Sequence, residues 1–119
     1  TTKERIELFK TAGKEVIISI LPVVDDFERA VNSLQDTEEH KHLIEGIVLV
    51  QSKLNNILKS HGLKAMDAKG KPFDPEIHEA VTEVPVESKK QKGTVVDDIE
   101  KGYYLNDTLL RFAKVVVGK

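Results

Sequence analysis

The spacing of apolar residues changes once along the chain, near Gly62, and this change constrains the fold more than any other feature. Before Gly62, apolar side chains recur every three or four residues, which is the period of a helix with one buried face. After Gly62, short runs rich in valine alternate with turns that contain glycine, proline or asparagine, as is typical of β-strands. The sequence therefore predicts an α+β fold, helical over residues 1–62 and all-β over residues 63–119.

The first helix is expected over residues 3–35. Pro22 lies inside the pattern, and because it removes the hydrogen bond to the Ile18 carbonyl, it should kink the helix rather than end it. The opening residues, TTKERIELF, are typical of a helix entered partway. The apolar stripe is broad enough for more than one neighbour and comprises Ile6, Phe9, Ile17, Ile20, Val24, Phe27, Val31 and Leu34, widened by Val16, Leu21, Val23 and Ala30.

A second helix is expected to begin after SLQDTEE, with Asp36 or Thr37 as its cap, and to stop at Gly62. Gly46, inside this helix, costs about 1 kcal/mol relative to alanine. It is therefore either a tolerated glycine on a mobile helix or a point where another backbone comes close. The apolar positions form a heptad-like seam made of Leu43, Ile47, Val50, Leu54, Ile57 and His61.

Two helices with faces this broad cannot cover each other's apolar residues within one chain. The chain also has few large side chains with which to fill a core, since aromatic residues make up 5% of it and tryptophan is absent. Pairing with a second copy into a four-helix bundle would bury both faces. We therefore expect a homodimer whose interface includes Ile17, Ile20, Val24, Phe27, Leu43, Ile47, Val50, Leu54 and Ile57.

The second half of the chain is expected to form short strands. GLKAMDAKGKPFDP predicts a short strand and a loop, EAVTEVPVE a strand that Pro85 restricts to an edge or to a strand end, and SKKQKG a solvated loop. TVVDDIEKGYYL predicts a strand with a bulge at Gly102. A turn at Asn106 and Asp107 then leads into a final strand over the rest of NDTLLRFAKVVV.

Arg111 occupies an unusual position on this final strand. By the two-residue period of a strand, it shares a face with Leu109, Ala113, Val115 and Val117. A guanidinium on an apolar face has to be paired, exposed or available to a partner, because burying it alone costs too much free energy. The residues alone leave these three alternatives open.

Composition and motifs argue against several classes of function. The chain has 18 basic and 20 acidic residues and a net charge of −2, which is not the charge pattern of a nucleic-acid-binding surface. It has no cysteine, which excludes thiol catalysis and sulfur-ligated metals, and no apolar run long enough to span a membrane. Motifs for phosphate loops, dinucleotide binding and nucleophile elbows are absent. We expect no enzyme, no cofactor, no direct nucleotide contact, and neither a nucleic-acid nor a membrane partner.

The histidines do not indicate a metal site either. His40 and His42 lie in a charged helix opening, where a solvated face is the simpler interpretation. His78 could be combined with Asp74 and Glu76 as metal ligands, but this spacing is unspecific and no second histidine supports it. We expect no bound metal.

Four stretches in a fixed order carry a resemblance to a known family. They are LPVVDDFERA (21–30), the EGI around Gly46, GKPFDPEIHEAV (70–81) and GTVVDDIEKGYYLNDTLLRFAKVVV (93–117). Together they resemble the GrpE family, the nucleotide-exchange factors of DnaK-type ATP-dependent chaperones, from about residue 15 to the end. The resemblance implies a cytoplasmic homodimer with paired long helices, a four-helix bundle and a compact β-domain, the wing, on each protomer. It also implies that a wing docks on the chaperone's ATPase domain and opens its nucleotide cleft, so that ADP leaves.

The resemblance also implies which residues take part in chaperone binding. Arg111 matches the arginine of the family's final strand motif, and the alternative is that it pairs with a carboxylate of its own domain. Gly46 matches a glycine in the bundle helix. Four further residues match the loop that leads into the wing, where shaping a turn is the alternative to direct contact: Phe73, Asp74, Pro75 and His78.

The chain departs from the family pattern at three positions of its last strand motif. Thr108 stands where arginine is frequent, Phe112 where a small residue or proline is frequent, and Lys114 where an apolar residue is frequent. These departures bear on the details of the wing contact. The competing class of function is a non-catalytic dimeric scaffold or adaptor whose β-domain binds another partner.

Overall fold

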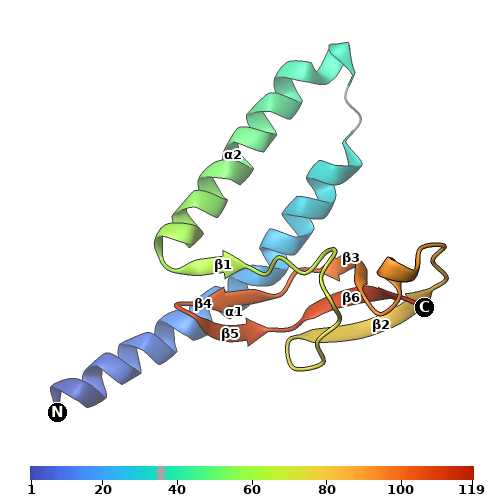
Figure 1. The fold of residues 1–119 in the computed structure, drawn as a ribbon. Helices are drawn as coiled ribbons and strands as arrows, with labels where there is room; N and C mark the ends of the chain where they lie inside the picture. The colour runs from blue at the N-terminus through green and yellow to red at the C-terminus, as the bar shows by residue number, and fades with distance from the viewer. Residues whose placement is uncertain (35–36) are drawn as a thin grey trace. The chain divides into compact units, whose positions relative to one another are not determined.

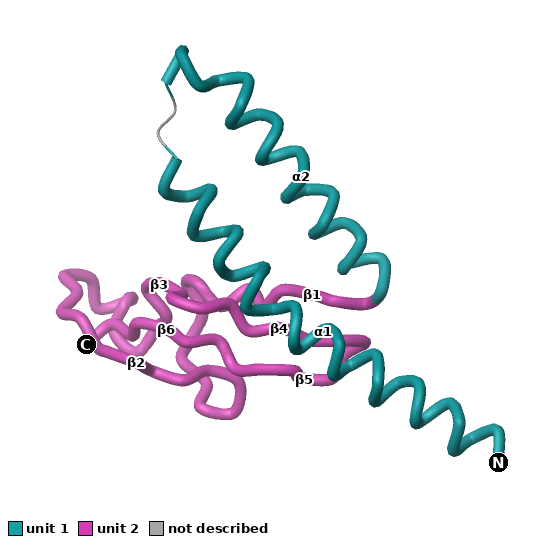
Figure 2. Tube along the Cα trace, turned by 180° about the vertical axis from the view of Figure 1, so that it is seen from behind, with its two compact units in different colours: residues 1–61 teal, residues 62–119 magenta. Residues whose placement is uncertain are grey.

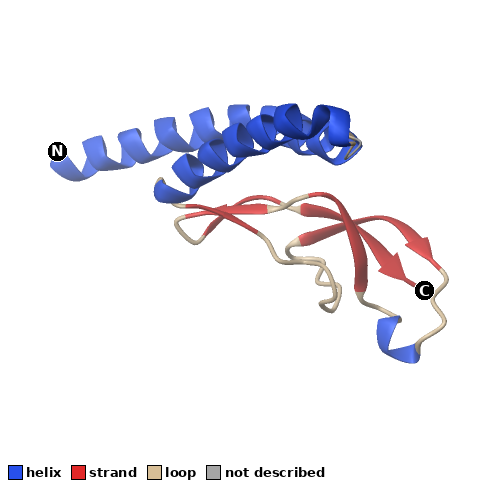
Figure 3. Cartoon of the chain, turned by 90° about the horizontal axis from the view of Figure 1, so that it is seen from above, coloured by secondary structure: helices blue, strands red, loops and turns tan. Residues whose placement is uncertain are grey.

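The structure, a computed structural model, describes residues 1–34 and 37–119. It divides into two compact units, residues 1–61 and residues 62–119 (Figure 2). The first unit contains the helices α1 (Thr2–Ser33) and α2 (Lys41–Ser60), with a short 3-10 turn, η1 (Glu38–His40), before α2. The second contains six short strands and the 3-10 turn η2, Lys89–Gln91 (Figures 1 and 3). The expected α+β fold class is confirmed.

Helix α1 begins at a cap and runs without interruption through Pro22. The Thr1 hydroxyl accepts a hydrogen bond from the Glu4 N–H at 3.3 Å, which satisfies one of the free donors of the first turn. Pro22 lies inside the helix, so the expectation that it would not end the helix is confirmed. Neither helix in residues 1–34 and 37–119 combines the length and the apolar composition that a membrane-spanning helix requires.

Helix α2 begins at Lys41, within one residue of the start expected after SLQDTEE. The turn η1 occupies residues 38–40, and Thr37, one of the two expected caps, caps η1 without a side-chain hydrogen bond. The other expected cap, Asp36, lies outside the described residues. At the other end the expected stop is confirmed, because α2 ends at Ser60 and Gly62 has a φ of +96°, a conformation that glycine adopts with little strain.

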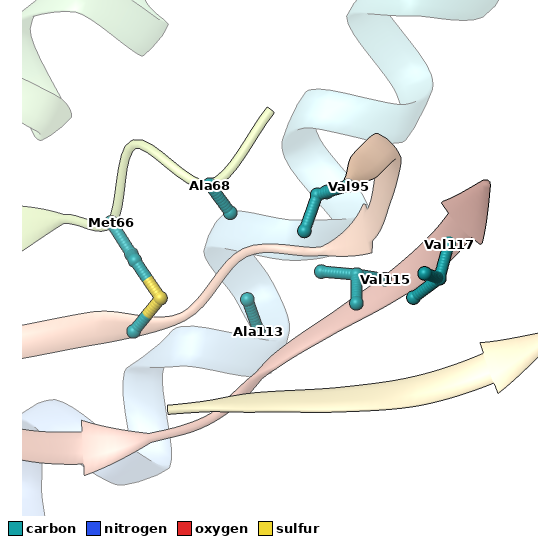
Figure 4. Packing of buried hydrophobic residues seen from close by; sticks show 6 residues of the cluster. All are labelled: Met66, Ala68, Val95, Ala113, Val115 and Val117. Carbon is teal, nitrogen blue, oxygen red and sulfur yellow. The ribbon is translucent and has the colours of Figure 1, made fainter. Parts of the chain in front are cut away.

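The second unit is built from two three-stranded sheets. The first has the order β1-β4-β5, and the second the order β2-β6-β3 with β6 in the centre, parallel to β2 and antiparallel to β3. The strand bounds are β1 Leu63–Ala65, β2 His78–Val84, β3 Val95–Glu100, β4 Tyr103–Leu105, β5 Thr108–Arg111 and β6 Ala113–Gly118. The buried cluster of this unit is formed by β3, β6 and the segment that follows β1, and consists of Met66, Ala68, Val95, Ala113, Val115 and Val117 (Figure 4).

The two longest expected strands are each divided, which corrects the prediction. TVVDDIEKGYYL forms β3 and β4, and NDTLLRFAKVVV forms β5 and β6. The chain therefore leaves one sheet and enters the other at residues 101–102, and returns to the first at Phe112. Gly102 therefore lies between two strands rather than in a bulge. A Cβ at Gly102 would lie 2.7 Å from the Ala113 backbone nitrogen and 2.8 Å from Met66 Cε, so only glycine fits this crossing without displacing its neighbours.

Other local expectations for the second half are confirmed. Strand β2 ends at Val84, directly before Pro85. Asn106 and Asp107 both have positive φ, +49° and +68°, which is the conformation of the two central residues of a tight hairpin turn. The expected SKKQKG loop contains the short turn η2, in which the Lys90 N–H donates a hydrogen bond to the Ser88 hydroxyl.

Candidate functional site

Arg111 is the last residue of β5 and contacts Glu100, Lys101 and Tyr103 at the point where the chain passes from one sheet to the other. Its Nε–H donates a hydrogen bond of 2.8 Å to the Lys101 carbonyl oxygen. Its Nη1 lies 3.6 Å from Oε1 of Glu100, and its guanidinium carbon lies 5.2 Å from the centre of the Tyr103 ring. Of the three alternatives for this residue, the structure shows the paired one, with the side chain 20% exposed.

The hairpin of β4 and β5 explains why Tyr103 faces Arg111. Counting outward from the turn, Leu105 pairs with Thr108 and Tyr104 with Leu109, and a regular ladder would then pair Tyr103 with Leu110. A bulge in β5 shifts the register by one residue, so Tyr103 pairs with Arg111 instead. Paired residues project to the same side of a sheet, and this places the guanidinium over the ring.

The face pattern predicted for the final strand survives the break at Phe112. Ala113, Val115 and Val117 are buried in the core cluster, whereas Phe112 and Lys114 are exposed. Arg111 continues the inward row at the rim of the unit, where its side chain is partly accessible.

The loop before β2 forms one tight turn centred on Asp74. The Asp74 carbonyl accepts hydrogen bonds from the Ile77 N–H (3.1 Å) and the His78 N–H (2.8 Å), and its carboxylate accepts one from the Glu76 N–H (3.0 Å). The Asp74 N–H donates to Nδ1 of His78 at 3.0 Å. His78 is 4% exposed, and its ring centre lies 5.9 Å from that of Phe73.

This geometry favours the turn-shaping alternative for the loop residues. The side chain of His78 is buried and its Nδ1 is already an acceptor, so it can act on a partner only by shaping the turn. Phe73 packs against the core cluster, and Pro75 is exposed at the tip of the turn. Among the described residues, no group of three or more histidine, aspartate or glutamate side chains could hold a metal ion.

The helical unit leaves two apolar rows exposed. On α2, Leu43, Val50 and Ile57 recur every seven residues and are 63%, 56% and 57% exposed. On α1, a second row with the same spacing consists of Phe9, Val16 and Val23, which are 74%, 57% and 58% exposed. Sequence reasoning used Val16 and Val23 only to widen the stripe. The other residues expected at a dimer interface are already partly or fully covered within the chain: Ile17, Ile20, Val24, Phe27, Ile47 and Leu54.

Gly46 lies beside the exposed row of α2, one helical turn after Leu43 and one before Val50. No atom outside its own helix backbone would lie within 4 Å of a Cβ at this position, so contacts within the chain do not explain the glycine. Lys53, seven residues further along the same line of the helix, is also exposed. Gly46 and Lys53 thus flank the apolar row on one side, and Leu49, one turn after Gly46, is also exposed.

Sequence reasoning missed three residues that contact Arg111: Glu100, Lys101 and Tyr103. Lys101 and Tyr103 belong to the KGYY sequence and Glu100 precedes it, but the pairing of Tyr103 with Arg111 depends on the bulge, which nothing in the local sequence marks.

Comparison with known proteins gives a consistent result. The family model described as GrpE matches residues 1–119. Proteins named Protein GrpE are 41% identical in Bacteroides thetaiotaomicron, 42% in Porphyromonas gingivalis strain W83 and 43% in Carboxydothermus hydrogenoformans, each over 119 residues. These matches cover 100% of this chain and 62%, 61% and 60% of the relatives, so the chain spans about three fifths of their length. Because the family model matches the whole of the chain, which folds as two long helices followed by a small β unit, the chain belongs to the GrpE family.

Proposed function

We propose that this chain is the chaperone-binding part of a co-chaperone that promotes ADP release from a DnaK-type chaperone, in protein folding and the response to stress. The observation that carries the proposal is family membership over all 119 residues. In this function the protein transforms no substrate. It acts by binding the open form of the chaperone's nucleotide cleft better than the closed form, which is the way a ligand shifts a conformational equilibrium.

The β unit is the proposed docking element. It has its own buried core and presents Arg111 at a rim where the guanidinium is held by several contacts. An arginine that is already oriented loses less conformational entropy on binding than a mobile one. Pro75 is exposed in the Asp74 turn, which is stabilised by the hydrogen bond from the Asp74 N–H to His78 and by the contact between the rings of His78 and Phe73.

The helical unit is the proposed dimerisation element. Its two rows of exposed apolar residues have the seven-residue spacing of helices that pack together along their length. A second copy would cover both rows in a four-helix bundle. Gly46, which flanks one row, would remain accessible to the chaperone.

The direct test is release of a fluorescent ADP analogue from a purified DnaK-type chaperone, with and without this protein. We expect release to become faster in proportion to the protein added, until it saturates. The control is a protein with Gly46→Asp and Arg111→Ala together, which should accelerate release far less. An unchanged release rate, together with a dimer of normal mass, would favour the scaffold or adaptor function instead.

A further inference from the structure

We propose that Glu100 is a positioning residue for chaperone recognition: its carboxylate sets the direction of the Arg111 guanidinium without itself touching the chaperone. This inference rests on the proposed function, since it assumes that Arg111 is a chaperone contact. It adds a residue that the family resemblance does not assign, and it makes recognition depend on a charge at the end of β3.

The base of the Arg111 side chain is fixed by the backbone. Its Nε–H bonds to the Lys101 carbonyl oxygen at 2.8 Å. That carbonyl lies in a tightly held connection, because the neighbouring Gly102 carbonyl accepts the Met66 N–H at 2.8 Å and there is no room for a side chain at Gly102. The Tyr103 ring adds a surface 5.2 Å from the guanidinium carbon.

The guanidinium is planar, so Nε and the two terminal nitrogens move as one rigid group. The plane of this group can still tilt about the hydrogen bond from Nε–H to the Lys101 carbonyl oxygen, and Glu100 limits that tilt. Its Oε1 lies 3.6 Å from Arg111 Nη1, and its Oε2 lies 3.7 Å from Lys114 Nζ. The carboxylate is thus held between two cations, which restricts its own rotation. The Glu100 side chain is 31% exposed and that of Arg111 is 20% exposed, so the pair is partly shielded from water but open at the surface.

Such a pair contributes little to folding but can matter for binding. Partly exposed ion pairs stabilise proteins weakly, because solvent screens them and ordering the side chains costs entropy. A partner that must meet the guanidinium in one orientation, however, gains whenever that orientation is already populated. We therefore expect Glu100 to affect chaperone affinity more than the stability of the free protein.

The test is a double-mutant cycle on chaperone affinity, using Glu100→Gln, Arg111→Ala and the two together in the intact protein. Arg111→Ala should raise the dissociation constant about thirtyfold or more, as for a central interface arginine. Glu100→Gln should raise it about two- to fivefold. In the Arg111→Ala background, Glu100→Gln should have no further effect, because the group that it positions is gone.

Two further variants and one stability measurement complete the design. Glu79→Gln is the matched control. Glu79 lies opposite Lys114 in the register of β2 and β6, and the change removes the same charge from the same sheet. It should change affinity less than Glu100→Gln does and show no coupling to Arg111. Glu100→Asp keeps the charge and should restore part of the affinity. The thermal midpoint of the free Glu100→Gln protein should stay close to that of the unmodified protein.

The outcomes separate this inference from the proposed function. If Arg111→Ala leaves affinity unchanged, Arg111 is not a chaperone contact, and that part of the proposed function fails along with the inference. If Arg111→Ala weakens binding while Glu100→Gln leaves affinity unchanged or raises it, the inference alone is wrong. An equal loss from Glu100→Gln in both backgrounds would also overturn it, because Glu100 would then act independently of Arg111.

Discussion

The two units of this molecule bury their apolar residues to very different extents. The β unit encloses a continuous cluster of six buried residues, among them Val95 and Val115, which are almost completely inaccessible. The helical unit is longer by three residues, yet the buried residues of its described part are Leu21, Val24 and Leu58, and several of its large apolar side chains form exposed rows. A small sheet unit can complete a core within one chain, whereas two amphipathic helices with broad faces need a further partner.

The largest expected effect comes from placing charge on the exposed row of α2. Val50→Glu with Ile57→Glu should dissociate the proposed dimer at micromolar concentration. Each of these side chains contributes about 1.5–3 kcal/mol when fully buried, and a symmetric interface loses each contribution twice. Glutamate is a good helix former, so α2 itself should persist. Sedimentation equilibrium measures the mass.

The matched control is Ser52→Glu with Asn56→Glu, two exposed positions elsewhere on α2. This variant should remain a dimer. If the unmodified protein is a monomer at micromolar concentration with its helices intact, the helical unit does not need a second copy to cover its apolar rows, and this contrast with the β unit is wrong.

The second prediction concerns Gly46→Asp, which distinguishes two partners for the same surface. Aspartate has a better helix propensity than glycine, and no atom of the chain blocks a side chain there. We expect the dimer to form and chaperone affinity to fall about tenfold or more, that is by at least 1.4 kcal/mol. Titration calorimetry gives the affinity and sedimentation the mass. Loss of the dimer would instead place a second helix against Gly46.

The third prediction tests how tightly the β unit is packed. Gly102→Ala should lower the free energy of unfolding by about 1–3 kcal/mol, because the new methyl group meets the Ala113 nitrogen and Met66. Both tyrosines of the chain, Tyr103 and Tyr104, lie in β4, so urea unfolding followed by tyrosine near-UV circular dichroism reports on this unit.

The control for that variant is Gly13→Ala in α1, where nothing lies within 4 Å of a Cβ. It should leave the tyrosine signal unchanged and strengthen the helix by up to about 1 kcal/mol. Equal unfolding curves for Gly102→Ala and the unmodified protein would mean that the crossing between the sheets is looser than described.

The smallest expected effect concerns the turn between β4 and β5. Asp107 has a φ of +68°, which alanine adopts at greater cost than aspartate, so Asp107→Ala should lower the free energy of unfolding by about 1 kcal/mol. Asp107→Gly should change it by less than about 0.5 kcal/mol, since glycine is favoured at this turn position. The same tyrosine signal measures both. A neutral Asp107→Ala would indicate that the hairpin does not depend on the turn.

The sequence predicted the features that depend on local chemistry and on period. Pro22 did not end α1, Gly62 ended the second helix, and Asn106 and Asp107 formed the hairpin turn, because each depends on the backbone preferences of one or two residues. The alternation of buried and exposed residues after Arg111 also held through the break in the strand.

The features that the sequence did not predict depend on contacts between distant segments. The local sequence predicts a bulge at Gly102. In the structure this residue instead joins β3 of one sheet to β4 of the other, with Ala113 and Met66 close to it. The contact of Arg111 with Tyr103 depends on a one-residue shift in β5. His78 is polar and was expected at a contact surface, but the turn around Asp74 uses its Nδ1 and buries it.

The central functional claim is that this protein binds the open cleft of the chaperone in preference to the closed one. The most direct test is its affinity for one DnaK-type chaperone in the nucleotide-free and ADP-bound states, measured beside the chaperone's affinity for ADP with and without the protein. Binding free energies are linked, so ADP must weaken this protein's binding by the same factor by which the protein weakens ADP binding. We expect that factor to correspond to about 3 kcal/mol or more, at the upper end of typical coupling. Equal affinity for the two states would mean that the protein binds without shifting the cleft, and would contradict the claim.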